Sequence, residues 1–243
     1  VVSTTGGNGN WDIANNQITL KNNGNTGVPV GLYGIDIELN SASTTNVEHN
    51  TVYISGSNGG SPAYGYDFSS YGFFRFPNGS GAVTGDVVNL RNNIFVNTRI
   101  VSNGLTTGHF AIANQGASSG TNWNLSNNNL LVTGNGSKSF VGYWLNATKL
   151  ALSDWQTASG KDAASYTATY NSGTSSFAGG TLEPDNLFIN PLSDVHIKTT
   201  DGESYQFVSN RGVAVATATD YDGDTRTSTP DLGADEFFIC TIP

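Results

Sequence analysis

The chain has 243 residues, a formal charge of −9 and only 12% charged residues. It has no basic patch for binding phosphate, so nucleic acid is not an expected partner, and no run approaches the ~20 apolar residues of a membrane span. The single cysteine, Cys240, excludes a disulfide within the chain.

Acidic residues gather in the last quarter of the chain. From Glu183 onward, eleven acids and three bases give a balance of −8, whereas the first 182 residues hold eight acids and seven bases, a balance of −1. The chain contains no methionine and no signal peptide. We therefore expect a processed part of a longer exported polypeptide, located outside the cell or at its surface.

Four stretches share one pattern, in which an aliphatic residue is followed three positions later by asparagine and then by a short β-prone run. Their starts, at residues 13, 47, 90 and 125, are 34, 43 and 35 residues apart. A period of this kind is typical of a solenoid, in which each coil contacts only its neighbours. The asparagines are predicted to hydrogen-bond along the stack, at about 4.8 Å per coil. They are Asn16, Asn50, Asn93 and Asn128. The alternative is that they are surface residues of unrelated turns.

A second family of short strands lies between these units, and several of its members alternate apolar with polar or small residues. Its members are residues 34–39, 65–68, 109–113 and 140–145. Helical periodicity is almost absent, while the glycine and asparagine that suit tight turns are abundant. The sequence therefore predicts an all-β fold, a right-handed parallel β-helix of about eight coils with a C-terminal capping segment.

The coils are expected in residues 1–182, with loop insertions near 61–84 and 147–181. Aromatic residues are frequent in the first insertion, and their rings could provide a platform on which sugars stack. The glycan-binding candidates are Tyr64, Tyr66, Tyr71 and Trp144, with Trp155 as a further aromatic. The alternative is that these rings are core or ladder residues, as most aromatics of β-proteins are. The second insertion contains one short helix around residues 150–155.

Several motifs follow one another in the last part of the chain. They are Ser153-Asp-Trp-Gln-Thr-Ala-Ser-Gly-Lys-Asp-Ala163, Leu187-Phe-Ile-Asn-Pro191, Asp194-Val-His-Ile197, Asp220-Tyr-Asp-Gly-Asp-Thr-Arg226 and Asp231-Leu-Gly-Ala-Asp-Glu-Phe237. Together they resemble the C-terminal end of right-handed parallel β-helix domains in large bacterial surface and secreted proteins, the pectate-lyase-like superfamily in its broad sense. The resemblance implies that residues 183–237 form acidic terminal coils and a cap, and that residues 238–243 lead into a following module. Activity does not follow from it, because the superfamily also contains polysaccharide lyases and glycoside hydrolases.

Alternating carboxylates in the acidic segment suit a hard, oxygen-seeking cation, and the predicted ion is a structural Ca²⁺. The candidate ligands are Asp220, Asp222, Asp224 and Asp231. An EF-hand is not indicated, because Gly223 falls at the fourth loop position and Pro230 argues against a following helix. In the alternative, Arg226 pairs with a neighbouring acid and pins the segment to the last coil. Its candidate partners are Asp231, Asp235 and Glu236.

Residues for catalysis are few. A lyase needs a base that removes the proton alpha to a uronate carboxylate, and the strand-borne candidates are Arg75, Arg91 and Arg99. A hydrolase needs two carboxylates in one groove, and the best pair is Asp36 and Glu38, which point the same way from one strand. The three histidines, His49, His109 and His196, have no metal-ligand spacing.

The predicted function is a non-catalytic extracellular β-helix module of a surface adhesin or filament. Its expected partners are a polysaccharide or cell-surface glycan and the adjacent modules of its own chain. The alternative is a polysaccharide lyase or glycoside hydrolase that acts on an acidic polysaccharide.

Overall fold

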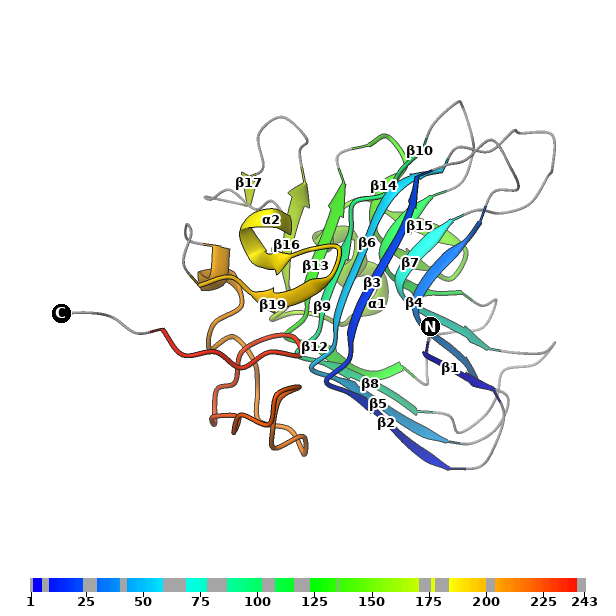
Figure 1. The fold of residues 1–243 in the computed structure, drawn as a ribbon. Helices are drawn as coiled ribbons and strands as arrows, with labels where there is room; N and C mark the ends of the chain where they lie inside the picture. The colour runs from blue at the N-terminus through cyan, green and yellow to red at the C-terminus, as the bar shows by residue number, and fades with distance from the viewer. Residues whose placement is uncertain are drawn as a thin grey trace.

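The structure, a computed structural model, describes residues 2–5, 9–23, 30–39, 43–58, 69–77, 87–101, 108–115, 123–134, 136–170, 176–177, 184–199 and 204–239. About half of these residues lie in three sheets whose strands are predominantly parallel (Figure 1). None of the helices in these ranges has the length and apolar character needed to span a bilayer. The predicted all-β class with stacked parallel strands is therefore confirmed.

The chain passes through the three sheets in a repeating order, A, then B, then C. Sheet A contains β1 (Val2–Thr5), β4 (Leu32–Leu39), β7 (Ser70–Pro77), β11 (His109–Asn114) and β14 (Ser139–Trp144). Sheet B contains β2 (Asn10–Ala14), β5 (Thr44–Glu48), β8 (Val87–Arg91) and β12 (Trp123–Asn127). Sheet C contains β3 (Gln17–Asn23), β6 (Thr51–Asn58), β9 (Ile94–Asn97), β10 (Ile100–Val101), β13 (Leu130–Gly134) and β16 (Tyr166–Tyr170). Each pass pairs with the passes before and after it, in parallel register.

Within the described ranges, four passes have strands in all three sheets and a fifth has strands only in sheets A and C. This is fewer than the eight coils predicted, because the acidic segment adds no further pass. The strand predicted at 65–68 falls outside the described residues, and the sheet A strand of that pass is β7. The predicted insertion at 147–181 is partly regular structure, since β16 belongs to sheet C.

A sharp corner joins sheet B to sheet C in each of the four complete passes. One residue there adopts the left-handed conformation, with φ between 54° and 60°. These residues are Asn15, His49, Asn92 and Asn128. Asparagine tolerates this conformation better than most residues because its short polar side chain can hydrogen-bond locally. The four sequence units therefore each span the end of a sheet B strand, the corner, and a sheet C strand.

The residue after each corner residue forms the amide ladder. Asn16 Nδ2 donates to Asn50 Oδ1 at 2.7 Å, Asn50 to Asn93 at 2.9 Å, and Asn93 to Asn129 at 3.0 Å. Three of the four predicted members are thus joined in line, and the alternative of unrelated turns is wrong for them. The fourth rung is Asn129 rather than Asn128, which is a left-handed corner residue.

A β-bulge explains the shifted register of the fourth unit. Trp123 pairs with Val88 but Leu125 pairs with Asn89, so β12 carries one more residue than its neighbour. A bulge leaves two residues opposite one and displaces the rest of the strand by one position. As a result Leu125 does not occupy the place of the aliphatic residue in the other units, and the ladder amide comes one residue later.

A second ladder runs along sheet B. Asn46 Nδ2 donates to Asp12 at 2.7 Å, Asn89 to Asn46 at 2.8 Å, and Asn124 to Asn89 at 3.0 Å. The sequence prediction missed it. Its signal was present in three units, where an Asp or Asn stands four residues before the ladder asparagine.

Antiparallel strands and a helix close the stack at the fifth pass. β15 (Ala147–Lys149) pairs antiparallel with β14, and β17 (Ser176–Phe177) with β16. The helix α1 (Leu152–Ser159), near the predicted position, buries Trp155 so close to Gly142 that a Cβ there would lie 2.3 Å from its ring. The ladder ends at the buried Asp162, which accepts hydrogen bonds from Asn129 Nδ2 (3.0 Å) and Trp155 Nε1 (2.8 Å).

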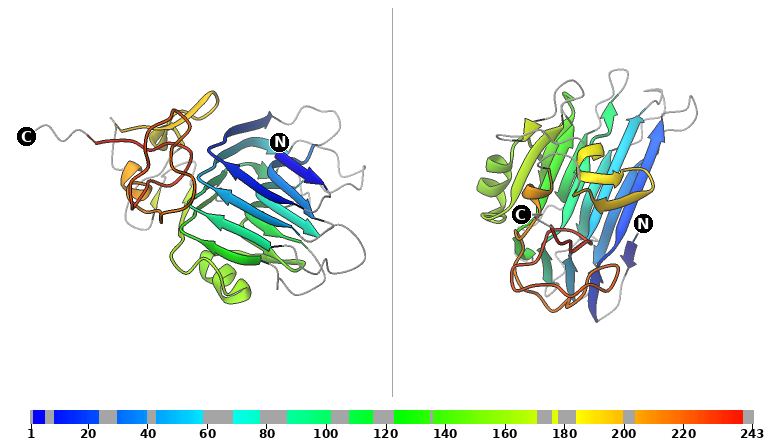
Figure 2. Two further views of the ribbon diagram at one scale, coloured as in Figure 1. Left: turned by 90° about the horizontal axis from the view of Figure 1, so that it is seen from below. Right: turned by 60° about the vertical axis from the view of Figure 1, so that its left-hand side comes forward.

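The acidic segment does not form terminal coils or a cap. We name residues 184–199 and 204–237 the flanking segment, because they lie beside the stack along sheet C (Figure 2). It contains α2 (Pro184–Leu187), β18 (Phe188–Asn190), β19 (Asp194–Ile197) and the 3₁₀ helix η2 (Ser204–Phe207). Its apolar side chains pack on the outward-facing residues of sheet C, as in the contact of Phe188 with Tyr53. The central strands β9 and β13 of sheet C are therefore buried on both faces.

The flanking segment also hydrogen-bonds to the corners of several passes. Asn15 Nδ2 donates to Thr219 O at 2.7 Å, Asn92 Nδ2 to Val213 O at 2.7 Å, and Asn128 Nδ2 to Arg211 O at 3.0 Å. These corners belong to the first, third and fourth passes. The segment thus ties the passes together from the side instead of extending the stack.

Candidate functional site

Aromatic side chains form a row on the outer face of sheet A. The rings of Tyr33 and Tyr71 lie 5.2 Å apart, those of Tyr71 and Phe110 5.2 Å, and those of Phe110 and Phe140 5.4 Å, with interplanar angles of 31°, 9° and 19°. One ring comes from each of four successive passes. The spacing of parallel strands places these rings in register, so they stack on one another.

This arrangement argues against the predicted sugar platform. A sugar stacks on a free ring face, whereas both faces of Tyr71 are covered by Tyr33 and Phe110, and only 4% of Tyr71 is exposed. Trp144 is buried in edge-to-face contact with Trp123 and Trp155, at 5.8 and 5.3 Å. These two candidates are therefore ladder and core residues. The other two, Tyr64 and Tyr66, lie outside the described residues.

A pair of carboxyl groups lies on the same face of β4. Asp36 and Glu38 are two residues apart and stand opposite Phe74 and Phe76 of β7. Asp36 Oδ1 is buried and has no hydrogen-bond partner among the described residues. Burial, and then the charge of Glu38, raise the pKa of Asp36 to about 6. A half-buried carboxyl group with one buried, unpartnered oxygen is costly, so it is a candidate for a functional role.

The three arginines considered as lyase bases are engaged in structural contacts. Arg75 is buried and donates to Asn114 Oδ1 at 2.8 Å, and Arg91 pairs with Glu48. Arg99 is also buried and donates to Val30 O at 2.9 Å, and burial lowers its pKa to about 10. These contacts give no arrangement in which the arginines converge on a substrate.

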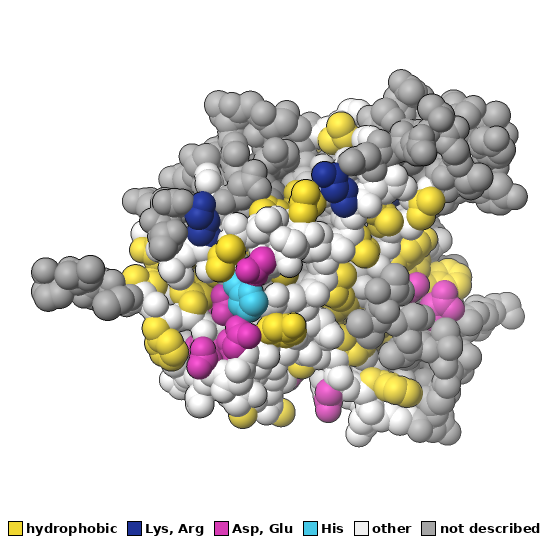
Figure 3. Space-filling model, viewed as in Figure 1, with side chains coloured by type: hydrophobic (Ala, Val, Ile, Leu, Met, Phe, Trp, Pro, Cys, Tyr) yellow, Lys and Arg dark blue, Asp and Glu magenta, His cyan; other side chains and the backbone are white. Residues whose placement is uncertain are grey.

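Acidic side chains in the flanking segment gather around a histidine on the surface (Figure 3). His196 Nδ1 contacts Asp194 at 2.5 Å, and His196 Nε2 contacts Asp222 at 2.8 Å. Burial alone lowers the pKa of His196, but the hydrogen bond to Asp194 and the charges of Asp235 and Asp194 outweigh it and leave that pKa raised. The hydrogen bond from His196 holds the pKa of Asp194 below its ordinary value.

Three carboxylates beside this histidine meet the geometric requirement for a shared cation. One oxygen each of Asp220, Asp222 and Asp235 lies within 4.8 Å of the others. Asp235 replaces Asp224 and Asp231 of the predicted set, which are not part of this group. The oxygens are of the kind that Ca²⁺ prefers. At least one of them also stabilises the local backbone, since Asp220 accepts hydrogen bonds from the backbone N–H groups of Asp222 and Asp224, at 2.9 and 2.8 Å.

Calcium at these carboxylates remains a prediction, and thermal unfolding tests it. The midpoint is measured in Ca²⁺ and in EDTA for the parent protein and for Asp222→Asn. A rise with Ca²⁺ that the variant loses would support the ion, because a ligand that binds only the folded state stabilises it. Equal midpoints in both buffers would leave the carboxylates with a structural role alone.

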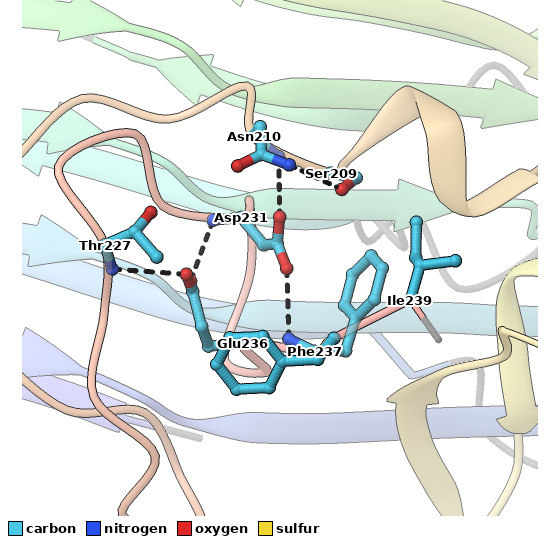
Figure 4. A pocket seen from close by; sticks show the side chains of 8 residues that line it. Ser209, Asn210, Thr227, Asp231, Glu236, Phe237 and Ile239 are labelled. Atoms are coloured by element: carbon cyan, nitrogen blue, oxygen red, sulfur yellow. Dashed lines mark hydrogen bonds between the residues drawn. The ribbon is translucent and has the colours of Figure 1, made fainter. Parts of the chain in front are cut away.

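Two further acids stabilise the end of the flanking segment, next to a pocket of about 200 Å³ (Figure 4). Asp231 accepts the backbone N–H groups of Asn210 and Phe237, at 2.6 and 3.0 Å, and burial raises its pKa to about 6. Glu236 accepts from Arg226 Nη1 at 3.2 Å. Of the three partners considered for Arg226, the structure thus selects Glu236.

The anchor point of Arg226 differs from the one predicted. Its Nη2 donates to Asn15 Oδ1 at 2.9 Å and to Gly233 O at 3.1 Å. Asn15 is the corner residue of the first pass, not the last. Arg226 therefore links the acidic end of the flanking segment to the opposite end of the stack from the one expected.

Two buried histidines make the stability of the fold depend on pH. Burial, followed by the charges of Arg226 and Arg99 respectively, lowers the pKa values of His49 and His109 to about 3. The unfolded chain then binds more protons between about pH 3 and 6.5, so stability falls as the pH drops through this range, by up to about 5 kcal/mol for each histidine. Asp36 and Asp231 have raised pKa values, so they bind more protons in the folded state and make stability rise as the pH drops through their titration range.

We expect His49→Asn to flatten this pH dependence, because asparagine suits the left-handed corner and does not titrate. Urea midpoints at pH 7.0, 5.5 and 4.5 should fall less for the variant than for the parent protein. His196→Asn is the control and should not flatten the profile, since the pKa of His196 is raised. An unchanged pH profile in His49→Asn would contradict the assignment.

Comparison with protein-family models, with curated proteins and with solved structures finds no match to this chain.

Proposed function

We propose that this chain is a non-catalytic module of an extracellular adhesin or surface filament, built as a right-handed parallel β-helix with sheets A, B and C as its faces. The repeated order of strands supports this interpretation, since each complete pass adds at least one strand to each sheet. Glycan binding is part of the proposal.

The observation that carries the proposal is the amide ladder. It links four passes through asparagine side chains and continues to Asp162 in the fifth. The flanking segment accepts hydrogen bonds from the corners of three passes and so ties these passes together from the side. Connections of this kind stiffen a stack along its axis, which is the property required of a surface rod that holds its loops away from the cell.

A glycan array tests the binding part of the proposal. We expect the parent protein to retain at least one polysaccharide and Tyr64→Ala with Tyr66→Ala to lose it. The matched control is Tyr221→Ala, because Tyr221 is an exposed tyrosine of the flanking segment. Failure of the parent protein to bind any polysaccharide would refute glycan binding and leave a purely architectural role.

A glycoside hydrolase is the second candidate. The buried Asp36 Oδ1, which has no hydrogen-bond partner among the described residues, favours it. A carboxyl group whose pKa is raised to about 6 can act as general acid, and Glu38 supplies the second carboxylate. Side chains two residues apart on a strand are separated by roughly 7 Å, within the range of inverting enzymes. The pair stands beside aromatic residues that lower its access to water.

Incubation with pectin and alginate separates the two candidates. The hydrolase predicts new reducing ends that Asp36→Asn and Glu38→Gln abolish and Asp12→Asn, an exposed acid of sheet B, preserves. A lyase also creates reducing ends, but its β-elimination leaves an unsaturated product that absorbs ultraviolet light. Reducing ends without this absorbance therefore identify the hydrolase. No product of either kind would leave the non-catalytic module.

A further inference from the structure

The two ends of the stack differ. At the fifth pass, α1, β15 and β17 close it, as described above. At the first pass, β1 and β2 stand at the ends of their sheets and β3 pairs only with β6 among the described strands. The outer edges of these three strands therefore offer backbone N–H and C=O groups for pairing.

Apolar surface accompanies this open edge. Trp11 of β2 is in register with Thr45 and Val88, both of which are fully buried, yet 43% of Trp11 is exposed. Among the described residues, Thr45 and Val88 have a pass on either side, whereas Trp11 has one on one side only. A further pass would bury Trp11 as its neighbours are buried.

The ladder has a direction that defines what can dock. The backbone N–H and the Nδ2 of Asn50 both donate to Asn93 Oδ1, at 3.0 and 2.9 Å, and those of Asn16 both donate to Asn50 Oδ1. Each ladder oxygen thus accepts two bonds from the preceding pass. Asn16 Oδ1 is the exception, since no described residue donates to it.

The second ladder ends in an acceptor at the same edge. Its amides donate toward the first pass, where Asp12 receives the last bond. The open edge therefore presents a carbonyl oxygen at Asn16 and a negative carboxylate at Asp12. A docking partner must bring hydrogen-bond donors to both positions.

This polarity disfavours a second copy of the chain as the partner. Two copies joined edge to edge would place acceptor against acceptor at Asn16 and like charges together at Asp12. Joined head to tail, the open edge would meet the antiparallel strands β15 and β17 and the helix α1. A coil with asparagine at both positions has the required donors.

We propose that the β1–β2–β3 edge is a docking surface for one additional parallel β-coil of a partner β-solenoid, which donates amide hydrogen bonds to Asn16 and Asp12. The coil covers Trp11 and extends both ladders by one rung. The second pass of this protein has the required chemistry, with Asn50 at the ladder position after the corner and Asn46 on sheet B. It can therefore serve as the probe.

The experiment places a second copy of residues 30–69 ahead of Val1 and measures thermal unfolding and amide hydrogen exchange. We expect the midpoint to rise by about 4 °C or more, and amides of β2 and β3 to gain protection. The matched control carries Asn46→Asp and Asn50→Asp in the added copy, which removes the side-chain donors and preserves the size. Its midpoint should rise less than that of the asparagine form, because only the backbone N–H of residue 50 and the strand pairing remain.

Three results would overturn the proposal. The first is an added coil that changes neither the midpoint nor the protection, and the second is a control that stabilises as well as the asparagine form. The third is a parent protein that sediments as a dimer whose edge amides are already protected, since a second copy would then occupy the edge. None of them bears on the glycan array, so the docking edge and the proposed function fail separately.

Discussion

Asn129→Ala is expected to lower the free energy of unfolding by about 3–5 kcal/mol, whereas Asn128→Gly is expected to cost about 1 kcal/mol. Asn129 is fully buried, and its amide bonds to Asp162, to Leu90 O and to Asn93. Alanine would leave several buried donors and acceptors unpaired. Asn128 loses one bond, to Arg211 O, and glycine accepts its left-handed conformation.

Urea unfolding followed by fluorescence of the four tryptophans measures both variants. The pair distinguishes two neighbouring asparagines of the same unit, only one of which is a rung. Equal destabilisation by the two substitutions would show that the bulge in β12 does not shift the ladder. A larger effect at Asn128 would support Asn128 as the fourth rung, as the sequence pattern predicts.

Arg226→Met is expected to destabilise the protein by about 3–5 kcal/mol and to loosen the flanking segment. The side chains of Arg226 and Glu236 are each only 3% exposed, so methionine would leave a buried carboxylate without its counter-charge. It would also break the bonds to Asn15 and Gly233. Removal of the segment's anchor should expose the apolar outer face of sheet C.

A double-mutant cycle with Glu236→Gln tests this pair. We expect Glu236→Gln to cost less in the Arg226→Met background than in the parent protein, because the charge has already lost its partner. Arg211→Met is the control, as Arg211 is a partly exposed arginine of the same segment that lies over the Tyr166 ring. Additive losses in the cycle would mean that Arg226 acts through packing and not through Glu236. Protease cleavage within residues 204–237 reports the loosening independently.

Much of the stack was predictable because its signals are local. The aliphatic residue, the asparagine and the β-prone run recur in each unit, and the chain turns from one sheet to the next at that point. Three ladder members follow directly from this pattern. Asn129 was missed because a single inserted residue, in the bulge between Trp123 and Leu125, changes the register without changing the motif.

The sequence also indicates in part that another segment covers the outer face of sheet C. Ile94-Phe-Val96 and Leu130-Leu-Val132 are apolar at consecutive positions, which is typical of strands buried on both faces. One face of each strand points into the stack, and the other face must be covered by another segment. The alternation of apolar and polar residues that marks half-buried strands is absent from both runs. These runs could have indicated that some segment lies on the outside of this sheet.

The sequence by itself determined the all-β class, the parallel stacking and most of the amide ladder, because these depend on short repeats whose identical side chains meet when one pass lies on the next. Only the tertiary structure decided where the acidic segment packs and which contacts individual aromatic and charged residues make. Three features depend on contacts between distant parts of the chain: the stacking of Tyr71, the burial of Asp36 Oδ1 without a described hydrogen-bond partner, and the bond from Arg226 to Asn15. No local pattern encodes which of several apolar faces a long polar segment will cover.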